Sequence, residues 1–129
     1  MRETSLDEIN LLTEKIIGAA IEVHRILGPG LLESTYRICL VHELRLQGLN
    51  VETEKYLAIT YKNLVVENAY RLDLLTEKTV IIELKCVDRL HSVHEAQVIS
   101  YLKLSGCRVG LLINFNVKLL KDGIKRLVV

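Results

Sequence analysis

Apolar residues recur at helical spacing over the first part of the chain. Within residues 6–27 they form one stripe, made of Leu6, Ile9, Leu12, Ile16, Ala19, Ala20, Val23, Ile26 and Leu27. This is the spacing of one face of an amphipathic helix. Ser5 followed three residues later by Glu8 is typical of a helix N-terminus, and Gly28-Pro29-Gly30 ends the pattern. A long N-terminal helix is therefore predicted.

The rest of the chain alternates between helix and strand patterns. Helices are predicted over about 32–47, followed by Gly48, and over about 93–105, followed by Gly106. Strands are predicted over 51–61 (bulged near Lys55), 64–75, 79–85, 108–113 and 124–128, the last a short edge strand. Without the first helix and the last strand, the order is αβββαβ. We therefore expect the α/β (α+β) class, with a mixed sheet flanked by helices and a parallel pair joined by the last helix.

Residues 64–85 are predicted to form a hairpin that turns at Thr76-Glu77-Lys78. Side chains alternate between the two faces of a strand. One parity is apolar and comprises Leu72, Leu74, Val80, Ile82 and Leu84, whereas the other contains Arg71, Asp73, Glu83 and Lys85. If odd residues pair with odd residues, both carboxylates and the lysine share one face.

The charged face of this hairpin is not purely polar. Leu75 and Ile81 share its parity, so we expect the charges to lie in a partly buried cleft. Carboxylates buried close together repel each other unless a proton or cation lies between them. The pattern thus favours a divalent metal ion beside Asp73 and Glu83, with Lys85 supplying one positive charge.

Several short motifs occur in a fixed order along the chain. They are Gly30-Leu31-Leu32-Glu33-Ser34-Thr35-Tyr36, Asp73, Glu83-Leu84-Lys85 and Gln97-x-x-x-Tyr101. The first fits a G-x-x-E-x-x-Y signature. Over about residues 16–114 the chain resembles a GxxExxY protein of the PD-(D/E)XK nuclease superfamily, in the branch with an additional Q-x-x-x-Y motif.

The resemblance implies a metal-dependent nuclease that acts on DNA or RNA. In such an enzyme Asp73 and Glu83 would bind Mg²⁺ or Mn²⁺ together with the backbone carbonyl of Leu84, and Glu33 would assist, often through water. The dipole of a helix N-terminus also favours Glu33 without any function. A structural ion pair is the alternative for Asp73 and Glu83.

Further roles follow from the same resemblance. Lys85 would position or deprotonate the attacking water and stabilise charge on the phosphate. Gln97 and Tyr101 lie one helical turn apart and would line the site or contact the nucleic acid. Val93 and Leu104 flank this pair, which predicts that the helix face turns inward. Polar residues at a helix–sheet interface are the alternative.

Other residues have simpler explanations. We expect Tyr36 to pack in the core with its hydroxyl tethered. His91 and His94 could bind a metal or phosphate, but no third ligand is apparent in the sequence, so ordinary solvated histidines are the default. Cys39, Cys86 and Cys107 are odd in number and lack C-x-x-C spacing, which favours reduced thiols.

The length and hydropathy of the chain indicate its domain organisation and its location. With 129 residues, half of them hydrophobic, we expect a single domain over 1–129. No apolar run approaches the ~20 residues of a membrane helix, and no signal peptide is apparent, so a cytoplasmic protein is expected.

The net charge of +1 is low for a tight nucleic-acid binder. It leaves open a non-catalytic nucleic-acid-binding or protein-interaction module. Two groups of basic residues could contact phosphates, namely Lys118, Lys121, Lys125 and Arg126, and Arg71, Arg89 and Lys103. A homodimer, as in small resolvase-type members, would enlarge the contact surface.

Overall fold

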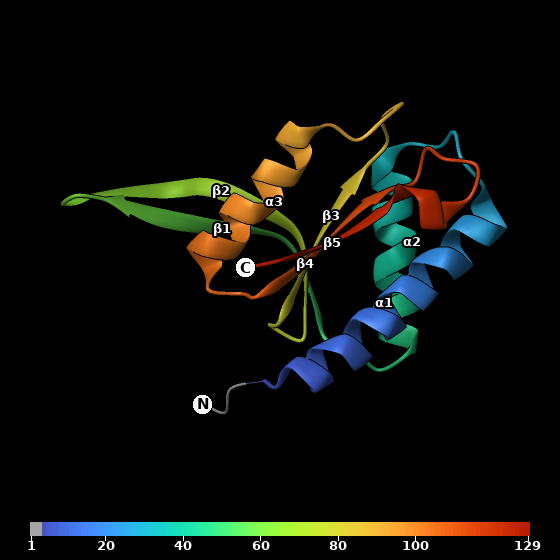
Figure 1. Cartoon of the computed structure of the whole chain (residues 1–129), viewed down its shortest axis with the longest axis horizontal. Coiled ribbons are helices and arrows are strands. Elements are labelled where there is room, and N and C mark those ends of the chain that lie inside the picture. Colours follow the sequence, from blue (N-terminus) through green and yellow to red (C-terminus); the bar gives the residue numbers. More distant parts are fainter. Residues whose placement is uncertain (1–3) are drawn as a thin grey trace.

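The computed structural model describes residues 4–129 and contains one mixed five-stranded sheet (Figure 1). Its strands lie in the order β1 (Val51–Tyr61), β2 (Leu64–Thr76), β3 (Val80–Lys85), β4 (Val109–Asn114) and β5 (Ile124–Val128). Strands β3 and β4 are parallel and all other neighbours are antiparallel. Helix α3 (Ser92–Ser105) joins the parallel pair. The predicted fold class and αβββαβ order are confirmed.

The helices lie on the two faces of this sheet. Helices α1 (Leu6–Leu27) and α2 (Glu33–Leu46) cover one face, and α3 covers the other (Figure 1). At the start of α1 the Ser5 hydroxyl accepts a hydrogen bond of 3.2 Å from the Glu8 backbone N–H. At its end Gly28 has a φ of 70°, a conformation that glycine adopts at little cost. The predicted limits of the first helix therefore hold.

The hairpin between β2 and β3 has the predicted parity. Leu75 pairs with Ile81 and Thr76 with Val80, so odd residues oppose odd residues. The turn comprises residues 77–79, one position later than predicted, because Thr76 still belongs to β2. Glu77 and Lys78 both have a φ of 52°. A three-residue turn preserves the odd-with-odd register that brings Asp73 to the side of Glu83.

One residue of the predicted apolar face lies elsewhere. Leu74 packs in the core beneath α1 and α2, but Leu72 packs with Leu75 and Ile81 in the core beneath α3. The paired register of β2 and β3 ends at Leu74 with Ile82. Beyond that point β2 continues with β1 alone, and a two-stranded ribbon twists more strongly than a wide sheet. The assignment of Leu72 to the first face was therefore wrong.

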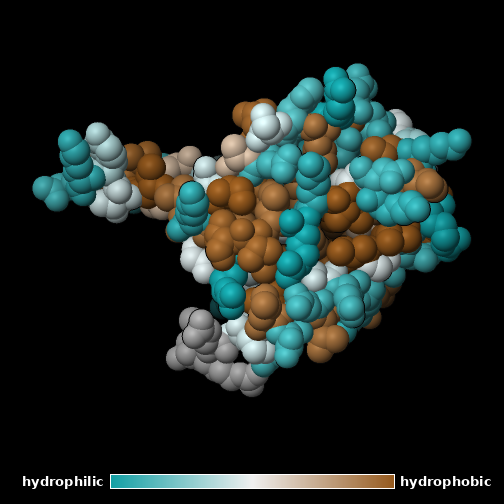
Figure 2. Space-filling model, in the orientation of Figure 1, coloured by the Kyte–Doolittle hydropathy of each residue, from teal (hydrophilic) through white to brown (hydrophobic). Residues whose placement is uncertain are grey.

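The far ends of β1 and β2 form an arm, defined here as residues 56–70, that projects from the body of the molecule (Figures 1 and 2). The register shifts between Leu57 and Ile59, slightly beyond the irregularity predicted at Lys55. Glu54, the neighbour of Lys55, has a φ of 47°. The chain therefore bends where the arm leaves the sheet.

The remaining predictions concern the chain ends and connections. The last strand, β5, pairs antiparallel with β4 at the sheet edge, as predicted. A short 3₁₀ helix at Leu120–Gly123 precedes it and was not predicted. Among residues 4–129, no helix is both long and apolar enough to cross a membrane. The expectation about a signal peptide falls partly on residues 1–3, which lie outside the described residues.

Candidate functional site

The candidate residues gather where β2 separates from β3. Asp73 is 2 % exposed, and its Oδ2 accepts a hydrogen bond of 3.1 Å from the backbone N–H of Leu84. Its Oδ1 accepts a second bond, of 3.2 Å, from Nη2 of Arg71. The aspartate thus satisfies a strand N–H that no longer has a ladder partner, and buried N–H groups nearly always find one. This explains how a carboxylate is tolerated inside the strand.

Glu83 is the least satisfied group in the site. The residue is 5 % exposed, and Oε1 lies 3.7 Å from Nζ of Lys85. Oε2 is buried and forms no hydrogen bond with any described residue. Burial raises the pKa of Glu83 to about 8, and the nearby Asp73 charge adds to the rise while Lys85 opposes it. A cation beside Oε2 would relieve this cost.

Glu33 approaches the hairpin from the first turn of α2. Partial burial raises its pKa, as does the charge of Asp73, while Lys85 and two arginines oppose the rise. Its Oε2 lies 3.7 Å from Nη1 of Arg37, and its side chain is 39 % exposed. Within residues 4–129, no three Asp, Glu, His or Cys side chains are arranged to hold a metal ion. Glu33 therefore does not complete a three-carboxylate cluster.

Gln97 and Tyr101 reach the same region from α3. The Gln97 amide Nε2 donates a hydrogen bond of 3.0 Å to the Tyr101 hydroxyl. Burial raises the pKa of Tyr101, and the negative charge of Glu83 raises it further. The Tyr101 ring also stacks on Tyr70 of β2 at a centroid distance of 5.2 Å. The pair thus borders the carboxylates, although Gln97 bonds its helix neighbour.

The face of α3 that carries Gln97 and Tyr101 is partly buried, but the two residues predicted to flank it are exposed. Val93 and Leu104 are 67 % and 53 % exposed, whereas Val98 and Leu102 are buried. Gly110 of β4 permits this packing, because a Cβ there would lie only 2.8 Å from Cγ1 of Val98. The prediction from Val93 and Leu104 was wrong because one apolar residue at each end of a short helix does not define its buried face.

Tyr36 fixes the loop that leads to Glu33. Its buried hydroxyl donates to the carbonyl of Gly28 at 2.5 Å and accepts a bond of 3.1 Å from the Leu31 N–H. Its ring stacks on Phe115 at 4.7 Å. The expected tethered core tyrosine is confirmed. Tyr36 thus tethers the loop between α1 and α2 to the core.

The two histidines act at the start of α3. The backbone N–H of His91 donates a hydrogen bond of 3.0 Å to Nδ1 of His94. This contact satisfies a backbone group at the helix N-terminus. An ordinary structural role, which is the expectation for both histidines, is sufficient to explain this contact.

Two residues in the site were not identified from the sequence. Arg37 on α2 contacts Glu33 and also Glu54 of β1, through Nε at 3.3 Å. Glu54 in turn contacts Arg71, and Arg71 contacts Asp73. The spacing of Glu33 and Arg37, four residues apart on a helix, is a signal for an ion pair. No sequence signal placed Glu54 beside them.

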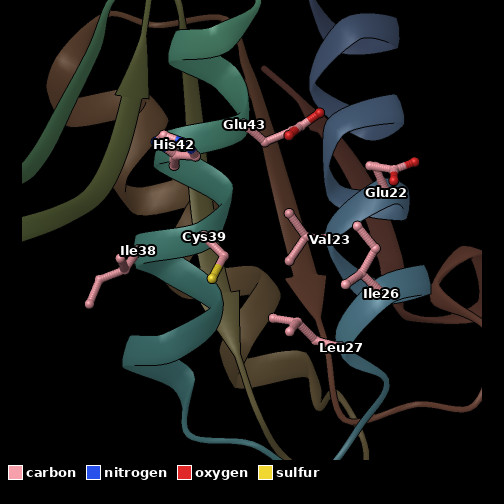
Figure 3. Close-up of a pocket in the computed structure, with 8 residues that line it drawn as sticks. All are labelled: Glu22, Val23, Ile26, Leu27, Ile38, Cys39, His42 and Glu43. Atoms are coloured by element: carbon pink, nitrogen blue, oxygen red, sulfur yellow. The ribbon is translucent and has the colours of Figure 1, made fainter.

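A separate apolar groove lies between α1 and α2 (Figure 3). The picture shows Val23 and Leu27 of α1 facing Cys39 of α2. None of the eight residues that line it belongs to the candidate site. The three cysteines are free thiols, as expected.

Comparison with known proteins identifies the superfamily of the chain. A family model described as the PD-(D/E)XK nuclease superfamily matches residues 10–127. The chain belongs to this superfamily. No curated protein and no solved structure gives a significant match. The narrower GxxExxY assignment stays a prediction from the motifs.

Proposed function

We propose that this PD-(D/E)XK protein is a metal-dependent nuclease that hydrolyses phosphodiester bonds of DNA or RNA. The observation that carries the proposal is the buried Oε2 of Glu83, which has no hydrogen-bond partner among the described residues. It lies in a carboxylate whose pKa is raised by burial and by Asp73. A buried carboxylate oxygen without a partner destabilises the folded protein unless a cation or a proton is bound to it.

The donor set fits a hard divalent cation. Asp73, Glu83 and the Leu84 carbonyl offer oxygen ligands, and Glu33 would assist through water, as its partly exposed position in the first turn of α2 allows. Oxygen ligands of this kind suit Mg²⁺ or Mn²⁺. When bound, the metal would supply Lewis-acid stabilisation of the phosphate and make a water molecule more acidic.

The chain's own groups would orient the substrate around this point. Lys85 is 20 % exposed in its side chain and lies beside Glu83, so its ammonium can reach both solvent and the site. It would hold the attacking water and stabilise negative charge on the phosphate. The Gln97 and Tyr101 side chains would contact the nucleic acid or support the ligands from α3.

A second function has support from two observations. Asp73 is already paired with Arg71, and the chain has a net charge of only +1. Both agree with a non-catalytic nucleic-acid-binding or protein-interaction module that keeps the fold. A nuclease and a non-catalytic module differ in whether the site binds a divalent metal ion and whether the protein cleaves a nucleic acid.

Calorimetry with Mn²⁺ tests the proposal directly. Wild type is expected to bind Mn²⁺, and Asp73→Ala to lose this binding together with cleavage of single-stranded, duplex and branched DNA and RNA. Glu95→Ala is a matched control, because this carboxylate pairs with Lys125 at 3.2 Å outside the site. Equal cleavage by wild type and Asp73→Ala would indicate a contaminant. Metal binding without cleavage of any substrate would favour the non-catalytic module.

We infer that the protein acts in the cytoplasm, where its three unpaired cysteines would stay reduced. A homodimer would lengthen the phosphate-contact surface of so small a chain. Light scattering on the purified protein measures the oligomeric state.

A further inference from the structure

We propose that Arg37 and Arg71 form a clamp for a backbone phosphate of the nucleic acid, and that Glu54 occupies this clamp when no nucleic acid is bound. The inference rests on the proposed function only in requiring a nucleic-acid ligand. It assigns a binding role to two arginines and a regulatory role to one glutamate.

The geometry of the three side chains is that of an anion held between two guanidinium groups. Nε of Arg37 lies 3.3 Å from Oε1 of Glu54. Nη1 of Arg71 lies 3.8 Å from Oε2 of the same carboxylate. Each arginine thus approaches a different oxygen. A phosphodiester likewise presents two oxygens that share one negative charge, and the guanidinium group of arginine is well suited to bind such a pair.

The clamp adjoins the candidate site. Nη1 of Arg37 lies 3.7 Å from Glu33, and Nη2 of Arg71 lies 3.2 Å from Asp73. The hydrogen bond to the buried Asp73 holds Arg71 independently of Glu54, and Arg37 is itself largely buried, with its side chain 15 % exposed. A phosphate bound between them would therefore lie next to the carboxylates of the candidate site, and the clamp would help to position the nucleic acid there.

The exposed fractions of the three side chains indicate which of them can move out of the clamp. The side chain of Glu54 is 47 % exposed, that of Arg71 is 38 % exposed and that of Arg37 is 15 % exposed. An ion pair with so exposed a carboxylate contributes little to stability. Glu54 can therefore swing into solvent at small cost while Arg37 stays anchored. Exchange of the carboxylate for a phosphate leaves no charge buried without a partner.

A purely structural link between α2 and β1 is the competing explanation for the contacts. The two explanations differ in what happens when the Glu54 charge is removed.

The test compares two single-charge variants of one strand. Glu54→Gln removes the competing anion, whereas Glu52→Gln removes the same charge from a carboxylate that pairs with Lys55 at 2.6 Å. Binding of fluorescein-labelled single-stranded and duplex DNA and of single-stranded RNA is measured by anisotropy in EDTA, so that no metal-dependent cleavage occurs. Glu54→Gln is expected to bind about threefold or more tightly than wild type, and Glu52→Gln within about twofold of it.

Substitution of either arginine is expected to change how the affinity for nucleic acid depends on salt concentration. Arg37→Gln and Arg71→Gln should bind more weakly, with the slope of log affinity against log salt smaller by about one. Should either variant unfold, Arg71→Lys and Arg37→Lys keep the charge but lose the forked geometry and should still weaken binding. Circular dichroism confirms that each variant is folded.

The outcomes separate the clamp from the nuclease assignment. A Glu54→Gln variant that binds no more tightly than Glu52→Gln overturns the clamp, as does the failure of every variant and wild type to bind any probe. Tighter binding by Glu54→Gln without cleavage of any substrate supports the clamp and overturns the nuclease. Cleavage by wild type with no Glu54 effect on binding overturns the clamp alone.

Discussion

Asp73 accepts a 3.1 Å hydrogen bond from the backbone N–H of Leu84, across the point where β2 and β3 stop pairing. The aspartate side chain therefore takes the place of a ladder partner on the neighbouring strand. This contact positions Asp73 beside Glu83 and also stabilises the end of β3. Structural and functional roles of this residue can be separated by choosing the substitution.

Asp73→Ala is expected to lower the free energy of unfolding by about 1–3 kcal/mol, because it leaves the buried Leu84 N–H without an acceptor. Asp73→Asn keeps an acceptor oxygen and should lose less stability, although it too should lose Mn²⁺ binding. Urea denaturation of both variants measures the difference. Equal destabilisation by the two substitutions would mean that the Leu84 contact contributes little.

Stability without metal should depend on pH through Glu83. Its pKa is raised from about 4.5 to about 8 in the folded state, so the folded protein binds more protons than the unfolded chain between these values. The free energy of unfolding should therefore fall as pH rises through this window, by at most about 1.4 kcal/mol per pH unit. Above about pH 8 this contribution levels off, since Glu83 is ionised in both states.

The measurement is urea denaturation in EDTA from pH 5 to pH 8.5, for wild type and Glu83→Gln. Gln cannot ionise, so the variant should lack this part of the slope. Glu33, whose pKa is also raised, is present in both proteins, and its charge raises the pKa of Glu83, so the difference between the two curves reports Glu83 together with its interaction with Glu33. Parallel stability curves for the two proteins would contradict the raised pKa.

Lys85→Ala should leave folding and metal binding nearly intact but slow cleavage by about 10²–10³-fold, which corresponds to roughly 2–4 kcal/mol of charge stabilisation. Lys85→Arg should not restore the full rate, because a planar guanidinium replaces a compact charge and does not release its proton. Single-turnover cleavage with saturating Mg²⁺ or Mn²⁺ measures both variants. Lys15→Ala, on the exposed side of α1 and outside both groups of candidate phosphate contacts, is the control and should cleave like wild type.

Tyr36→Phe removes a buried hydroxyl that both donates to Gly28 and accepts from Leu31. We expect the free energy of unfolding to fall by about 1–2 kcal/mol and amide exchange at Leu31 to accelerate. Thermal unfolding and hydrogen exchange provide the measurements. Tyr61→Phe alters a tyrosine that is 62 % exposed on the arm and should change stability by less than about 0.5 kcal/mol. A similar loss in both variants would argue against the tether.

Much of the architecture follows from local pattern. The limits of α1 depend on Ser5 and on the Gly28-Pro29-Gly30 turn, and both act on neighbouring residues. The parity of the β2–β3 hairpin follows from strand alternation and a three-residue turn. Such interactions span only a few residues, so hydrophobic periodicity and turn chemistry suffice to predict them.

The sequence alone therefore determined the element order, the odd-with-odd hairpin and the motif residues Glu33, Asp73, Glu83 and Lys85. Only the tertiary structure decided that Leu72 turns to the core beneath α3 and that Glu54 lies between Arg37 and Arg71. Both depend on where β2 leaves β3 and how β1 bends at Glu54. The sequence indicated a bulge near Lys55, but which side chains the bulge and the twist bring together depends on packing between distant segments, which no local pattern encodes.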